Sequence, residues 1–196
     1  MDELILGFRH CGSIIYCFQL PQLCPICKNV VSFTCDTPFR LPYPFVKAHQ
    51  HPLSIVLKST KGTFLEHYSC NEDLHIGITD CKGKVYEYDS DGLKKSNGEE
   101  WLQSIVVYEK SEEWSYDWSH ALRSVASDPK WRSENYDEQT LNCFSFVTEF
   151  LTNLNCVETK KEQFCEEFVY KKIVSLNKYI TVHRNIVKDG YCNIKN

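Results

Sequence analysis

The residues best suited to chemistry in this 196-residue chain are a cysteine at the start of a predicted helix and a histidine far upstream. Cys143 stands where a polar stretch gives way to apolar residues at helical spacing: Phe146, Val147, Phe150, Leu151 and Leu154. Asn142, or Thr140 two residues earlier, is a good N-cap. A thiol in the first turn of a helix lies at the positive end of the helix dipole, which favours the thiolate. Cys143 is therefore a candidate nucleophile.

A nucleophilic cysteine needs a base within hydrogen-bond reach, and His75 is the best placed of the seven histidines. It lies in the predicted strand 74–79, on the same face as Gly77 and Thr79. Gly77 leaves the backbone uncovered, as a site that admits a substrate often requires. We therefore expect His75 to exchange the proton with the thiol.

The register of the following hairpin decides which residue orients the His75 ring. A three-residue loop, 81–83, with its glycine in the left-handed position, makes Glu87 a diagonal neighbour of His75 on one face. A two-residue loop at Lys82-Gly83 brings Tyr86 to that face instead. We expect the three-residue loop, so Glu87 is the predicted partner and Tyr86 the alternative.

A second group of chemically capable residues lies near the N-terminus. Cys24 and Cys27 have the spacing at which two thiolates share one tetrahedral zinc ion. The further ligands are Cys11 as first choice, then His10 or Cys35, with Cys17 in reserve. Because His10 and Cys11 are adjacent, on a strand they would point to opposite faces and not easily bind one ion. The alternative is a reduced, partly buried cysteine cluster; redox chemistry is disfavoured because no βαβ pattern surrounds the motif.

Composition limits the class of protein. Hydrophobic residues make up 42% and aromatic residues 13% of the chain, enough for a packed core. The net charge of −4 gives no general attraction to nucleic acid or to anionic membranes. No apolar run approaches the roughly 18 residues of a membrane span, and no phosphate-binding loop or other organic-cofactor motif is present. We thus expect zinc as the sole cofactor and no nucleic-acid partner.

The first ten residues are acidic and then interrupted by Arg9 and His10, unlike a secretory signal. We therefore expect an intracellular protein, cytoplasmic or nuclear. There the eleven cysteines serve as reduced thiols, metal ligands or a nucleophile rather than as a disulfide framework.

The chain divides into three predicted parts. Residues 1–35 are a cysteine-rich segment with short strands, 36–52 are a proline-rich extended connection, and 53–196 form an α+β domain with C-terminal helices. Strands are predicted at 54–58, 63–65, 74–79, 84–88 and 104–108, and helices at 118–125, from Cys143, from a capping box at Thr159, and at 178–188. We expect an antiparallel sheet packed on helices.

The candidate site residues also resemble a known family. His75 on an early strand, Glu87 on the next, and Asn142-Cys143-Phe144-Ser145-Phe146-Val147 at a helix start resemble the circularly permuted papain-like proteins. Two branches of these proteins, the lecithin:retinol acyltransferase-like branch and the PPPDE peptidases, are similar to this chain in those residues. This resemblance implies a permuted papain-like domain that acts on lipid acyl esters or on ubiquitin-like conjugates. The acyltransferase-like branch usually has histidine where Glu87 and Ser145 stand here.

The whole chain resembles the makorin-2 opposite-strand protein family. The similarity lies in His10-Cys11, Tyr16, Cys24-Pro25-x-Cys27, 62–65, 74–79 and Asn142-Cys143. This second resemblance implies membership of that family and no particular activity.

Two functions are consistent with these patterns. The first is a cysteine-dependent hydrolase or acyltransferase whose Cys143–His75 dyad acts on an isopeptide or acyl substrate. In it the backbone N–H of Cys143 helps to hold the oxyanion, and Asn142 and Tyr86 are candidates for oxyanion binding or positioning. The alternative is an inactive papain-like fold that binds a protein partner and carries a structural zinc knuckle.

Overall fold

The computed structural model describes residues 4–32, 37–154 and 160–195, which form two compact units. The first unit comprises Met1–Pro44 and Ser175–Asn196, and the second comprises Phe45–Val174. The predicted boundaries at 35 and 52 therefore differ from the observed division. The C-terminal strand pairs with an N-terminal strand, so the end of the chain belongs to the first unit.

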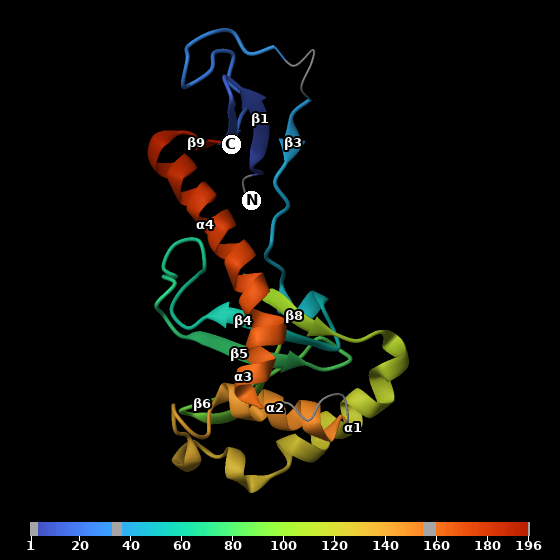
Figure 1. Cartoon of the computed structure of the whole chain (residues 1–196). Helices are drawn as coiled ribbons and strands as arrows, with labels where there is room; N and C mark the ends of the chain where they lie inside the picture. The colour runs from blue at the N-terminus through green and yellow to red at the C-terminus, as the bar shows by residue number, and fades with distance from the viewer. Residues whose placement is uncertain (1–3, 33–36, 155–159, 196) are drawn as a thin grey trace. The chain divides into compact units, whose positions relative to one another are not determined.

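The first unit is built on a four-stranded antiparallel sheet of order β3-β1-β2-β9 (Figure 1). Strands β1 (Leu6–His10) and β2 (Ser13–Cys17) form a hairpin, with β3 (Phe39–Arg40) beside β1 and β9 (Cys192–Lys195) beside β2. Among the described residues, one buried cluster on this sheet consists of Phe8, Ile15, Cys17 and Cys24. The cysteine-rich loop after β2 packs on this core through Cys24.

The second unit contains a five-stranded antiparallel sheet of order β7-β6-β5-β4-β8. Its strands are β4 (Ser54–Ser59), β5 (Leu74–Thr79), β6 (Val85–Asp89), β7 (Gly92–Ser96) and β8 (Ile105–Glu109). Helices α1 (Ser115–Ala126) and α2 (Cys143–Asn153) lie together along the sheet in Figure 1. Trp118 joins the layers, because its ring packs on Phe150 at 4.7 Å and its Nε1 donates to the carbonyl of Thr79 at 2.9 Å. The α+β class is confirmed.

Shorter helical segments complete the chain. Single 3-10 turns lie at Ala48–Gln50, Glu112–Trp114, Pro129–Trp131 and Ser133–Asn135. Helix α3 (Lys161–Phe164), a π-helical turn (Cys165–Val169) and α4 (Tyr170–Asp189) follow without a break. The helices predicted from Thr159 and at 178–188 are thus one succession, which ends before Gly190 at φ 79°. Thr159 itself lies outside the described residues. None of the described helices is long and apolar enough to cross a membrane.

One predicted strand is absent, and one strand of the five-stranded sheet was not predicted. Residues 63–65 form a turn rather than a strand, because the carbonyl of Thr63 accepts from the backbone N–H groups of His67 and Tyr68. Phe64 is buried there against Phe45 and Tyr68. Strand β7 was missed because its sequence is polar. It is an edge strand, and lysines such as Lys94 are typical of edges that must not pair further.

Candidate functional site

The β5–β6 hairpin has the predicted register. Gly77 pairs with Glu87, and Asp80 closes the loop through its N–H to the carbonyl of Lys84 at 2.8 Å. Gly83 takes the left-handed conformation at φ 76°. His75 and Glu87 are consequently diagonal neighbours, and His75 Nε2 lies 2.9 Å from Glu87 Oε2. The expected three-residue loop is confirmed.

Glu87 is buried and surrounded by donors. Besides His75, Trp101 donates from Nε1 to Oε1 at 3.2 Å, and Lys58 Nζ lies 3.6 Å from Oε2. Burial alone would raise the Glu87 pKa, but the His75 hydrogen bond, the Lys58 charge and the Trp101 hydrogen bond lower it to about 2. Glu87 is therefore a fixed negative charge beneath the imidazole.

Sequence reasoning missed both Lys58 and Trp101. Lys58 stands directly opposite His75 in the β4–β5 ladder, so the pairing of these strands would have indicated it. Trp101 lies in a loop, and no spacing pattern in the sequence indicated that it would contact Glu87. Its ring packs on His75 at 5.7 Å between centroids, and the Lys58 ammonium lies 4.7 Å from the Trp101 ring.

Cys143 is the first residue of α2, and the predicted cap Asn142 is confirmed. Asn142 Oδ1 accepts from the N–H groups of Phe144 at 3.0 Å and Ser145 at 3.3 Å. Ser145 Oγ in turn accepts from the Asn142 N–H at 3.3 Å, which completes a capping box. Asn142 Nδ2 donates to the carbonyl of Glu138 at 2.7 Å. The Asn142 side chain thus holds the helix start in place and is committed to that task.

The thiol and the imidazole meet between α2 and β5. Both side chains are buried, and His75 is hydrogen-bonded to Cys143 as well as to Glu87. Because Nε2 is engaged by Glu87, we assign Nδ1 to the thiol. Burial alone would lower the His75 pKa, but its hydrogen bonds to Cys143 and Glu87 raise it from 6.5 to about 9. The ring is therefore protonated at neutral pH.

A pocket of about 430 Å³ opens onto these two side chains. Tyr136, Asn142 and Phe144 line it around Cys143, and Leu74 lines it beside His75. The loop before Cys143 is tied by Asp137, whose Oδ1 accepts from the backbone N–H groups of Gln139 and Thr140 and from the Thr140 hydroxyl. A substrate carbonyl can thus reach the start of α2.

The alternative partner Tyr86 lies outside this site. It alternates with Glu87 along β6 and therefore projects from the opposite face of the sheet. Its hydroxyl contacts the Lys95 ammonium there. Tyr86 neither orients His75 nor reaches the oxyanion position, which corrects the expectation.

Gly77 serves a different purpose from the one expected. A Cβ at this position would lie 2.9 Å from the Trp101 ring and 3.1 Å from the Tyr86 carbonyl. The glycine makes room for the indole that hydrogen-bonds Glu87, not for a substrate.

Gly77→Ala should therefore lower the free energy of unfolding by about 1–3 kcal/mol, because the buried indole must move. Urea denaturation measures this change. Ser124→Ala, at an exposed position of α1, is the control and should leave stability within about 0.5 kcal/mol of the parent. An unchanged midpoint for Gly77→Ala would show that Trp101 is not tightly packed.

His75, Glu87 and Asp89 also have potential metal-binding atoms within 4.8 Å of one another. Two ammonium groups already occupy the carboxylates, since Lys58 lies beside Glu87 and Lys94 Nζ lies 2.8 Å from Asp89 Oδ2. Both would repel a cation. The arrangement suits an imidazolium rather than a metal ion.

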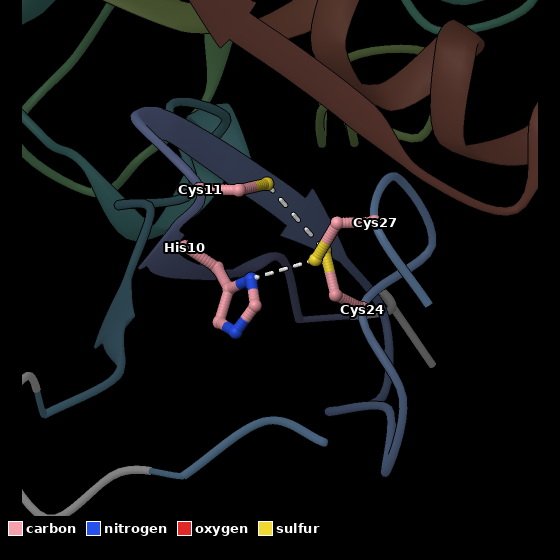
Figure 2. Close-up of side chains that lie close together, drawn as sticks. All are labelled: His10, Cys11, Cys24 and Cys27. Carbon is pink, nitrogen blue, oxygen red and sulfur yellow. Dashed lines mark hydrogen bonds between the residues drawn. The ribbon is translucent and has the colours of Figure 1, made fainter. Parts of the chain in front are cut away.

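In the first unit, His10, Cys11, Cys24 and Cys27 converge from two segments (Figure 2). Their ligand atoms all lie within 4.8 Å of one another, so the cluster could bind a metal ion. The expectation that His10 and Cys11 diverge was wrong. Cys11 is not on the strand but in the β1–β2 turn at φ 43°, and this conformation brings both side chains to one side.

Of the two other candidate ligands, only Cys17 can be placed, and it is not part of this cluster. Cys17 lies at the end of β2 with its sulfur 3.9 Å from the carbonyl of Leu6. Cys35 lies outside the described residues.

Comparison with known proteins places the chain in a family. Residues 38–186 match the DUF4796 C-terminal family and residues 4–31 match the DUF4796 N-terminal family. The chain belongs to the DUF4796 family. The chain is 32% identical over 205 residues to the MKRN2 opposite strand protein of Homo sapiens. The matched region covers 96% of this chain and 88% of the relative. The expected membership of the makorin-2 opposite-strand family is thereby confirmed. No solved structure matches the chain.

The two DUF4796 matches divide the candidate residues between them. The C-terminal match includes His75, Glu87 and Cys143, and the N-terminal match includes the whole cysteine–histidine cluster. Cys35 lies between the two matches.

Proposed function

We propose that the second unit is a cysteine-dependent hydrolase or acyltransferase that acts on an isopeptide or acyl substrate. The observation that carries this proposal is the His75 ring, which links Cys143 on one side to the buried Glu87 carboxylate on the other. A nucleophile, a proton-exchanging ring and an orienting group in this order are the parts that thiol catalysis requires.

The reaction follows from these positions. Cys143 Sγ, whose proton is held by His75, forms a bond to the substrate carbonyl carbon, and the carbonyl electrons move to its oxygen, near the N–H of Cys143 at the start of α2. His75 gives its proton to the leaving nitrogen or oxygen as that bond breaks, which leaves an acyl thioester. Water, or an acceptor amine or alcohol, then attacks the thioester while His75 takes its proton, and the C–S bond breaks to release the acyl product and free the Cys143 sulfur. Glu87 holds the ring through both steps.

The order of elements supports a permuted papain-like fold as part of this proposal. The histidine strand β5 precedes the cysteine helix α2, and α2 packs on β5 and β6. Ser145, where the acyltransferase-like branch usually has histidine, serves the capping box here. The dyad is therefore completed by Glu87 alone.

The charges around the pocket favour an amine leaving group. Glu72, Asp73 and Glu138 line the pocket, against a single opposing ammonium from Lys161. A lysine amine released from an isopeptide is cationic and is stabilised there, whereas the alcohol from a lipid ester gains nothing. We therefore favour isopeptides, such as those of ubiquitin-like conjugates, as substrates.

The test is detection of the acyl thioester. The protein is incubated with acyl-ε-lysine peptides and with matched neutral esters, and the intact mass is followed after rapid acid quenching. We expect an adduct on Cys143 that decays on turnover, with faster release of lysine than of a neutral alcohol of equal leaving ability. Complete absence of an adduct with both substrate classes would contradict the proposed function.

The pH profile of kcat/KM should fall on its alkaline side. Because the His75 pKa is about 9, the ring is protonated below this pH and loses its proton above it. kcat/KM should therefore fall as pH rises through about 9, since no proton remains for the leaving group. A rate that rises steadily from pH 7 to 10 would show that a neutral His75 is the active form.

A further inference from the structure

We propose that His10, Cys11, Cys24 and Cys27 bind one structural zinc ion through three sulfurs and His10 Nδ1. This site belongs to the first unit and is independent of the thiol chemistry proposed for the second.

The distances between the ligand atoms suit one tetrahedral ion. With Zn–S bonds of about 2.3 Å and a Zn–N bond of about 2.0–2.1 Å, tetrahedral ligands lie about 3.8 Å apart for two sulfurs and about 3.6 Å apart for sulfur and nitrogen. Cys11 Sγ and Cys24 Sγ are 3.8 Å apart, and Cys27 Sγ and His10 Nδ1 are 3.4 Å apart. A disulfide would instead need sulfurs about 2.05 Å apart. The spacing is that of ligands around an ion.

The hairpin turn is shaped to bring two ligands to this point. Cys11 and Gly12 both have left-handed conformations, at φ 43° and 75°. For a cysteine this conformation is strained, and it directs the thiol towards Cys24 (Figure 2). Lys28, directly after Cys27, is left-handed as well at φ 62°. Such strain persists where surrounding interactions compensate for it, and a metal ion supplies that compensation.

The loop that carries Cys24 and Cys27 is closed by its own backbone hydrogen bonds. Cys24 N–H donates to the carbonyl of Asn29 at 2.8 Å, and Lys28 N–H donates to the carbonyl of Cys24 at 2.9 Å. Both thiols therefore lie on one short closed turn, as in the paired-cysteine loops of structural zinc sites.

The donor set and its surroundings indicate zinc with a structural role. Three sulfurs and one imidazole in a tetrahedral arrangement leave no open position, as in structural zinc sites. Among the described residues, the buried cluster around Cys24 contains Phe8, Ile15 and Cys17, with four half-buried hydrophobic residues packed against it. A core this small gains much of its stability from a bound metal.

Elemental analysis of the purified, untagged full chain tests the site. We expect about one zinc per chain, and at least about tenfold less in Cys27→Ser and His10→Ala after dialysis against a chelator. Cys81→Ser, at an exposed cysteine of the second unit, and Cys35→Ser are the controls and should retain zinc. Absence of stoichiometric metal, stoichiometric iron, or zinc lost with Cys35→Ser but kept with His10→Ala would overturn the proposal.

A cobalt spectrum of the parent protein tests the ligand set without depending on variants that fold poorly. Co²⁺ exchanged into the parent protein should give the intense visible bands of a tetrahedral ion and the charge-transfer band of three thiolates. His10→Cys should keep the site and raise the charge-transfer intensity by about one third, since it adds a fourth thiolate. A weak octahedral spectrum for the parent protein would contradict the ligand set.

Discussion

Cys143→Ala should abolish formation of the acyl intermediate, and His75→Ala should slow it by about 10²–10⁴-fold. The first change removes the sulfur that is proposed to attack the substrate carbonyl. The second removes the group that holds the proton for the leaving atom, and it also leaves Glu87 without its closest donor. Rapid-quench mass spectrometry with the acyl-ε-lysine peptides measures both rates.

Cys165→Ser is the matched control for these variants. Cys165 is a half-buried thiol in the π-helical turn after α3, and it lines the pocket next to the candidate site. Among the described residues, His75 is hydrogen-bonded to Cys143, whereas Cys165 lines a neighbouring pocket that does not include His75. Its replacement should leave the rate within about twofold of the parent, as expected for a change away from the reacting atoms. Equal losses in Cys143→Ala and Cys165→Ser would remove the special role of Cys143.

Glu87→Gln should lower stability most in mildly acidic solution. The His75 pKa is raised from 6.5 to about 9, so the ion pair contributes fully below about pH 6.5 and is lost as pH rises towards 9. The Glu87 pKa is lowered from 4.5 to about 2, so the same contribution is present above about pH 4.5 and is lost as pH falls towards 2. Between these limits the variant should lose about 3 kcal/mol of unfolding free energy.

Urea unfolding at pH 5.5 and pH 9.5 measures this effect. The difference between parent and Glu87→Gln should shrink at the higher pH, where His75 is neutral in both proteins. Glu109→Gln, at the exposed end of β8, is the control and should show little difference at either pH. A loss for Glu87→Gln that is independent of pH would mean that packing, rather than the ion pair with His75, accounts for the role of Glu87.

Local patterns predicted the candidate site well wherever short-range rules determine geometry. The spacing of apolar residues and the capping residue Asn142 located the start of α2, and the left-handed glycine of loop 81–83 set the register that joins His75 to Glu87. These features depend on residues close together in the chain. A shift of the β5–β6 register by one residue would have placed Tyr86 at the site. The length of the hairpin loop therefore decided which side chain faces His75.

Features that depend on contacts between residues far apart in the chain could not be predicted from local patterns. Lys58 reaches Glu87 only because β4 pairs with β5, and Trp101 reaches it from a loop. The convergence of His10 and Cys11 depends on a left-handed cysteine, a conformation that its residue type does not favour. The C-terminal strand β9 joined the first unit through a pairing with β2 that spans almost the whole chain.

The most direct test of the account is the rate at which each cysteine of the folded protein is alkylated at pH 7. Cys143 is only 6% exposed, whereas Cys70 and Cys81 are exposed, so accessibility alone would make Cys143 the slowest of the three. Peptide mapping after brief treatment with iodoacetamide gives the separate rates. We expect Cys143 to react first, and His75→Ala to remove this preference, because the cationic ring of His75 acts on the Cys143 sulfur. A Cys143 that reacts no faster than Cys70 and Cys81 would contradict the proposed active site.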